Sequence, residues 1–200
     1  MNLKKIFSRI TRKLDEVDQT REEILKLSRQ MVRDCSVAIK SIHRKDFEAY
    51  GELITIIKEK HENLLNLVQK NPAFFSNYVK TPEQEYVEAI CLFSIIKNEE
   101  VPGPEECNIS EVNYLLGLAD VIGELRRYIL DKIRVGDIEN IENILNVMED
   151  IYTYLFALDY PKGITQDLRR KTDIARNLIE RTRGEISLTI QMDNLKKSLK

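Results

Sequence analysis

The chain has 200 residues, of which 42% are hydrophobic, enough to build one packed domain, which we expect to span residues 1–200. Its 31 basic and 33 acidic residues leave a net charge of −2, so net charge alone does not indicate nucleic-acid binding. No stretch reaches the roughly 18 apolar residues of a membrane span, and Cys35, Cys91 and Cys107 lack metal-ligand spacing. We therefore expect a cytoplasmic protein with reduced thiols and no membrane partner.

Apolar residues recur at helical spacing along the chain, and the few glycines and prolines fall between long helical patterns. No alternating strand pattern is present, so the sequence predicts an all-α fold, an antiparallel bundle of about six or seven helices. The expected helices cover residues 3–44, 47–69, 82–97, 110–135, 138–159 and 165–195, with a short turn at 72–78, a loop at 98–108, a tight link at 136–137 and a candidate break at Gly184.

The charges are unevenly distributed along the chain. Residues 1–45 hold twice as many basic as acidic residues, whereas residues 46–125 hold three times as many acidic as basic ones. Five cations of the first expected helix share one face, opposite its apolar face. This row suits the phosphates of a nucleic acid, although it is also compatible with an ordinary solvated face. The five are Lys26, Arg29, Arg33, Lys40 and Arg44.

Asp120 lies within the apolar run Leu115–Leu125, where a charged carboxylate is costly to bury without a compensating charge. Glu124 follows on the same helical face, and a second acidic pair, Glu85 and Glu88, occurs in another mostly apolar helix. A Mg²⁺ or Mn²⁺ ion takes oxygen ligands and would supply the missing positive charge. Such an ion can polarise a phosphodiester and lower the pKa of an attacking water.

A second interpretation of these acids stays open. A structural ion pair with Arg126 or Arg127, or partial exposure of the carboxylates, would also accommodate them. No Ser/His/Asp triad, Cys/His pair or glycine-rich phosphate loop competes with the acids as a catalytic motif. We expect His43 and His61 to lie at the surface or at helix ends, and we assign neither to catalysis.

Several motifs together resemble the translin/Trax family, over residues 26–184. The resemblance is closer to Trax, because translin lacks the acid that matches Asp120. The loop at 98–108 is shorter than the insertion that Trax carries there. The matching motifs are Leu27-Ser28-Arg29, His43-Arg44, Gln84-Glu85-Tyr86-Val87-Glu88-Ala89, Tyr114-Leu115-Leu116-Gly117-Leu118-Ala119-Asp120, Gly123-Glu124-Leu125, Gly136-Asp137-Ile138, Ile151-Tyr152 and Arg183-Gly184.

The resemblance implies more than the residues alone indicate. It implies that Glu85, Glu88 and Asp120 bind metal and cut RNA, with Glu124 as a neighbouring acid of the same cluster. It also implies an all-α fold and a hollow homo-oligomer, an octamer of the archaeal type, that encloses RNA. The expected function is a Mg²⁺-dependent endoribonuclease that acts mainly on single-stranded RNA. A translin-like protein that binds single-stranded RNA or DNA without cutting it is the alternative, and a purely structural helical subunit is a third.

Overall fold

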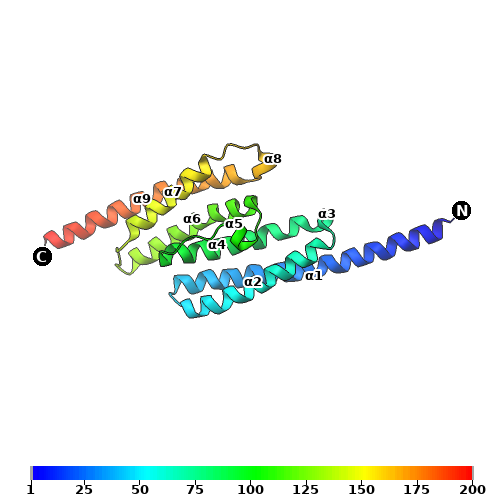
Figure 1. The fold of residues 1–200 in the computed structure, drawn as a ribbon. Coiled ribbons are helices and arrows are strands. Elements are labelled where there is room, and N and C mark those ends of the chain that lie inside the picture. The colour runs from blue at the N-terminus through cyan, green and yellow to red at the C-terminus, as the bar shows by residue number, and fades with distance from the viewer. Residues whose placement is uncertain (1, 200) are drawn as a thin grey trace.

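The structure, a computed structural model, describes residues 2–199, and this part of the chain contains helices and no strand (Figure 1). The all-α prediction is therefore confirmed. None of the described helices is long and apolar enough to cross a membrane. The long helices are α1 (Leu3–His43), α2 (Phe47–Gln69), α4 (Lys80–Lys97), α6 (Glu111–Arg134), α7 (Ile141–Phe156) and α9 (Leu168–Ser198), and short turns form α3 (Pro72–Phe75), η1 (Ser76–Val79), α5 (Pro104–Cys107) and α8 (Lys162–Thr165).

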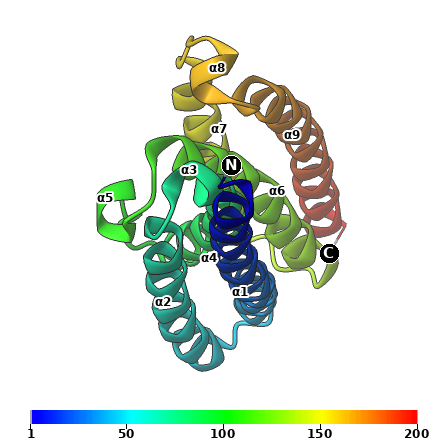
Figure 2. The same ribbon diagram turned by 90° about the vertical axis from the view of Figure 1, so that its right-hand side faces the viewer.

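The long helices pair into three layers, α1 with α2, α4 with α6, and α7 with α9 (Figure 1). Helix α4 packs on α1, and α6 packs on both α7 and α9, so α4 and α6 form the middle layer. In the end-on view of Figure 2, α6 lies between α1 and α9. Side chains on the inner faces of α4 and α6 can therefore meet residues from both outer layers.

Two helices project beyond this body, the start of α1 at one end and the end of α9 at the other (Figure 1). The start of α1 carries an apolar stripe whose members are between 44% and 63% exposed. An apolar stripe of this length on a projecting helix is typical of a surface that another chain covers. The stripe consists of Leu3, Ile6, Phe7, Ile10 and Leu14.

Several helix boundaries differ from the prediction by up to three residues, among them the starts of α4 and α7. Helix α4 begins at Lys80, because η1 runs directly into it. Helix α7 begins only at Ile141, because Asn140 before it adopts a left-handed conformation with φ 58°. Gly184 causes no break, and α9 continues through it to Ser198. A glycine inside a helix costs about 1 kcal/mol, which the packing of α9 against α6 and α7 offsets.

Helices α4 and α6 approach each other closely at Gly117. A Cβ atom at this position would lie 2.7 Å from the carbonyl oxygen of Gln84 and 2.7 Å from the Cβ of Val87. Only glycine fits here without displacing backbone. Gln84 and Val87 flank the acidic pair of α4, and Gly117 lies about one turn before Asp120 on α6. The close approach therefore brings the two predicted acidic pairs toward one another.

We expect Gly117→Ala to lower the free energy of unfolding by about 1–3 kcal/mol, because the added methyl group overlaps a backbone carbonyl. Gly123→Ala in the same helix is the matched control, since its Cβ would meet nothing nearer than Leu178 Cδ1 at 4.0 Å. The control should gain about 0.5–1 kcal/mol from improved helix propensity. Urea unfolding followed by circular dichroism compares the two, and equal stability of the variants would show that the helices are not in close contact at Gly117.

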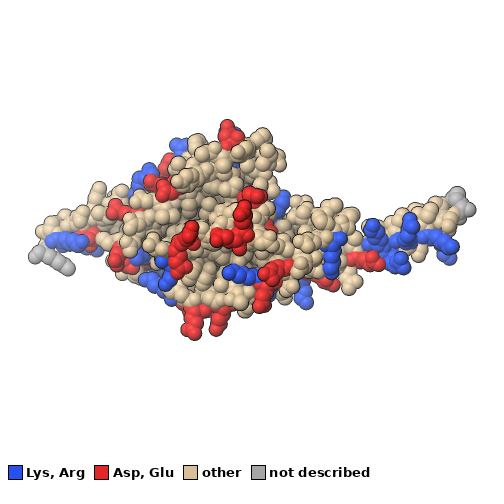
Figure 3. All heavy atoms as spheres, viewed as in Figure 1, with Lys and Arg blue, Asp and Glu red and all other residues tan. Residues whose placement is uncertain are grey.

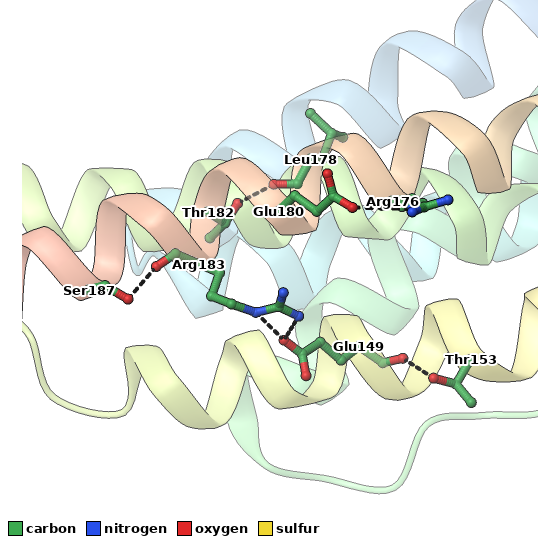
Figure 4. Close-up of polar contacts among 8 residues, drawn as sticks. All are labelled: Glu149, Thr153, Arg176, Leu178, Glu180, Thr182, Arg183 and Ser187. Carbon is green, nitrogen blue, oxygen red and sulfur yellow. Dashed lines mark hydrogen bonds and ion pairs between the residues drawn. The ribbon is translucent and has the colours of Figure 1, made fainter.

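Helix α9 is fixed against α7 and α6 by two ion pairs. Arg183 of α9 donates from Nη2 to Glu149 of α7 at 2.7 Å, and also from Nε at 3.2 Å (Figure 4). Arg126 of α6 donates from both terminal nitrogens to the two carboxylate oxygens of Glu185, at 2.7 and 2.8 Å. Arg126 is thus not the partner of the predicted acids. The two pairs set the register of α9, which brings Lys171 to the middle layer.

Candidate functional site

Four half-buried carboxylates gather where α4 and α6 approach each other, and we call them the acid cluster: Glu85, Glu88, Asp120 and Glu124. Burial, and then the charges of the other three acids, raise the pKa of Glu88 to about 8. Burial and the neighbouring Asp120 charge also raise the pKa of Glu85. Charge–charge effects weaken with distance, so the smaller contributions of these neighbouring acids place the four carboxylates within electrostatic reach of one another. The structure therefore brings together the four acids that the sequence singled out.

Asp120 is paired with Lys171 of α9, and not with either arginine that the sequence offered as a partner. The Lys171 ammonium also donates to Gln84 Oε1 at 3.1 Å and to the Leu116 carbonyl oxygen at 3.3 Å. Its side chain is 15% exposed, and its charge offsets part of the rise in the pKa of Glu85 and of Glu88. Sequence reasoning missed Lys171, because it lies 51 positions from Asp120 and carries no local signal.

Glu124 is held by His43, the last residue of α1. Nε2 of His43 lies 2.5 Å from Oε2 of Glu124, and Arg127 donates to the same oxygen at 3.5 Å. The hydrogen bond from His43 lowers the pKa of Glu124. The His43 side chain is only 5% exposed. The sequence was right to place it at a helix end, but its side chain is buried and engaged with the acid cluster.

The surface position predicted for His61 is wrong. His61 lies in the middle of α2 and is 3% exposed. Its Nε2 is 3.2 Å from Glu83 Oε1, and Asn113 donates to the other Glu83 oxygen at 2.6 Å. These buried groups satisfy one another and connect α2, α4 and α6. The available signal was the position of His61 between Ile57 and Leu64 on the apolar face of α2.

The donor chemistry of the acid cluster fits a hard divalent cation, although the side chains are not arranged as ligands. Among residues 2–199, no three Asp, Glu, His or Cys side chains form a group that could hold a metal ion as they stand. Asp120 is turned to Lys171, and Glu124 is turned to His43. Carboxylates that raise one another's pKa are the groups that a divalent cation would stabilise most. Ligation therefore requires Asp120 to leave the lysine.

The five predicted cations, which we call the basic stripe, lie exposed on α1 and on the residue that follows it: Lys26, Arg29, Arg33, Lys40 and Arg44. None of them forms an ion pair with another residue in 2–199. Arg29 lies two heptads before His43, so both fall close to one line along α1. The basic stripe therefore runs along the helix beside the acid cluster. Further basic residues gather on the projecting start of α1 (Figure 3).

The model of the Translin family matches residues 3–183 of the chain. The chain belongs to the translin family. An uncharacterized protein of Methanocaldococcus jannaschii is 42% identical over 185 residues, which cover 92% of this chain and 82% of that protein. Translin-associated protein X of Mus musculus is 25% identical over 190 residues. That match covers 73% of this chain and 64% of the mouse protein, so the chain spans less than two thirds of the mouse protein's length.

Solved structures of the same family share this fold. AfC3PO in complex with duplex RNA has a TM-score of 0.83 and 31% identity, covering 96% of this chain and 98% of that chain. The structure of apo-NeC3PO has a TM-score of 0.84 and 26% identity, covering 92% of this chain and 96% of that chain. The resemblance to the translin/Trax family that the motifs indicated is therefore confirmed for both sequence and fold.

Because the pKa of Glu88 is raised to about 8 from an ordinary value of 4.5, we expect Glu88→Gln to stabilise the chelator-treated protein above about pH 8. Between the ordinary pKa of 4.5 and the raised pKa of about 8, Glu88 keeps a proton in the native state that the unfolded chain has lost. The stability of the unchanged protein therefore falls as pH rises through this range. The variant should gain about 2 kcal/mol above about pH 8 and little near pH 5.

Urea unfolding in excess chelator, repeated across this pH range, measures the effect. Glu59→Gln is the matched control, because Glu59 is exposed on α2 and makes no ion pair within residues 2–199. The control should follow the pH dependence of the unchanged protein. A Glu88→Gln variant that also followed it would show that Glu88 does not share a site with the other acids.

Proposed function

We propose that this chain binds RNA as part of a homo-oligomer and hydrolyses it with a divalent ion, Mg²⁺ or Mn²⁺, held by the acid cluster. The observation that supports this most directly is the gathering of four carboxylates from two helices, with Lys171 paired to Asp120 and His43 hydrogen-bonded to Glu124. The likeness to AfC3PO, whose structure holds duplex RNA, supports RNA as the ligand. The motif match to Trax supports the same acids as the catalytic set.

In this proposal Glu85, Glu88 and Asp120 bind the ion, and Glu124 lies beside it. A bound ion supplies charge to polarise the phosphodiester and to lower the pKa of the attacking water. Either Glu85 or Glu88 would orient that water. Lys171 leaves Asp120 when the ion binds, and its charge then remains available to the phosphate oxygens.

The basic stripe holds the RNA backbone in this proposal. Its cations are exposed and unpaired within the described chain, so binding phosphates does not require an ion pair to be broken first. No groove-reading element or base-specific code is visible, which favours contacts to the backbone and to flexible single strands. The AfC3PO complex contains duplex RNA, so we do not restrict binding to single strands.

Assembly into a homo-oligomer, an octamer by analogy with the family, is part of the proposal. The projecting start of α1 exposes an apolar stripe that the described chain does not cover. A second copy of the chain would bury it and shield it from water. A closed assembly would also bring the basic stripes of several copies around one RNA molecule.

A second candidate function is a translin-like protein that binds single-stranded RNA or DNA without cutting it. The ion pair between Lys171 and Asp120 favours this candidate, because it already offsets part of the charge that a metal ion would neutralise. The other three acids weigh against it. Of these three, only Glu124 has partners of its own within residues 2–199, His43 and Arg127, while burial raises the pKa of Glu85 and of Glu88.

We expect cleavage of a labelled single-stranded RNA to require Mg²⁺ or Mn²⁺ and to stop in excess EDTA. Asp120→Asn should slow cleavage by at least about 100-fold, because it removes the charge of a metal ligand. RNA binding, measured by fluorescence anisotropy, should persist in this variant. Asp173→Asn is the matched control, since Asp173 is exposed on α9 close to Lys171 in sequence.

Two results would separate the candidates. Cleavage that survives excess EDTA, or that proceeds at the same rate in Asp120→Asn and Asp173→Asn, would remove the acid cluster from the chemistry. RNA binding without any cleavage in either metal would instead establish the translin-like candidate.

A further inference from the structure

A cavity of about 580 Å³ opens between the C-terminal ends of α1 and α6, and we call it the end cavity. Residues from both helices and from the turns that follow them line it. It is separate from the acid cluster, and the basic stripe reaches it only at its last two members. Its cations are Lys40, Arg44, Lys45, Arg127, Lys132 and Arg134.

The positive charge of the end cavity exceeds what two helix ends require. Its six cations are opposed by only two carboxylates in the lining, Asp131 and Asp137, which leaves a net charge of about four positive. Each helix C-terminus carries about half a negative charge, so the two helix ends account for about one of the four. The remaining excess, in a chain whose net charge is −2, indicates a site for an anion.

The cations of the end cavity differ in how far they are already engaged. Lys132 is paired with Asp137 at 2.6 Å, Arg134 with Asp131 at 3.1 Å, and Arg127 with Glu124 of the acid cluster at 3.5 Å. Lys40 of α1 and the two residues that follow the helix end, Arg44 and Lys45, make no ion pair with any residue in 2–199. One of them is Lys45, which is exposed and held in a left-handed conformation with φ 60°. These donors are free to bind an incoming anion.

His43 supplies a second observation that points to a ligand. Its side chain is 95% buried, since 5% is exposed, and its ring lines the end cavity. Nε2 is hydrogen-bonded to Glu124, whereas Nδ1 is buried with no hydrogen-bond partner. The nearest carboxylate oxygen to Nδ1, on Asp131, is 3.9 Å away, beyond hydrogen-bonding distance. A buried polar atom without a partner is costly. A ligand that shifts Asp131 would allow its carboxylate to pair with Nδ1 of His43.

We propose that the end cavity binds the terminal phosphate of an RNA strand. A terminal phosphate monoester carries about −1.5 to −2 charge near neutral pH, and it matches the excess positive charge better than the single charge of a phosphodiester inside a strand. Three arginines in the lining offer paired N–H donors that suit phosphate oxygens.

The position of the cavity connects it to the acid cluster. Two residues of the cavity lining, His43 and Arg127, contact Glu124 of the acid cluster directly. A strand anchored by its end would therefore lead directly to the carboxylates. The inference rests on the proposed function, and it adds a class of substrate: strands that carry a phosphate at one end.

The test compares one short single-stranded oligoribonucleotide in three forms, with a 5′-phosphate, with a 3′-phosphate and with hydroxyl groups at both ends. Binding to the full chain is measured by fluorescence anisotropy in excess EDTA, so that no strand is cut. One phosphorylated form should bind at least about 10-fold tighter than the hydroxyl form, since a few charge-assisted hydrogen bonds provide this difference.

Two double variants separate the end cavity from the basic stripe. Lys45→Gln with Arg134→Gln should leave the phosphorylated and hydroxyl forms binding within about twofold of each other, because both side chains line the cavity. The Arg134 side chain is 76% exposed and Lys45 is also exposed, so the fold should persist. Arg29→Ala with Arg33→Ala should weaken all three forms about equally and leave the preference unchanged.

Each outcome bears on one claim. Equal binding of the three forms, or a preference that survives Lys45→Gln with Arg134→Gln, would overturn the end cavity as a terminal-phosphate site while RNA binding stands. Failure of the unchanged protein to bind any form would overturn the proposed function, and this inference with it.

Discussion

The mutual repulsion of four carboxylates is the constraint on which the rest of this structure depends. The acid cluster exists because α4 and α6 approach so closely at Gly117 that a single methyl group would overlap backbone. Half-buried acids at such proximity resist ionisation, and the pKa of Glu88 is raised to about 8 as a result. A fold that holds these charges together must supply positive charge from elsewhere. In the chain as described, it comes from the two outer layers.

The outer layers contribute one partner each. Helix α1 ends at His43, which bonds Glu124, and α9 brings Lys171 to Asp120. The long sequence separation of these contacts shows why the whole bundle is needed to form the site. In the proposed mechanism the site has two states. In one, Lys171 is paired with Asp120; in the other, a divalent ion would take the place of Lys171.

The sequence was sufficient for the helical fold and for the acids, because both depend on local pattern. Helical periodicity predicted α2 to the residue. An aspartate in an apolar run is a rare local signal, and it led to Asp120. The counter-charges could not be predicted in the same way, because Lys171 and His43 reach the acids only after the helices pack. His61 was misplaced although its position between Ile57 and Leu64 on the apolar face of α2 indicated burial. Its partner Glu83 lies on another helix, so local pattern could not predict the hydrogen bond that satisfies it.

The most direct test of the central claim is a crystal of this protein soaked in Mn²⁺ and examined for anomalous scattering. The account predicts a peak between α4 and α6 within about 2.0–2.3 Å of carboxylate oxygens from Glu85, Glu88 and Asp120, with the Lys171 ammonium withdrawn from Asp120. A crystal saturated with Mn²⁺ that shows no peak there, with Lys171 still bonded to Asp120, would contradict it.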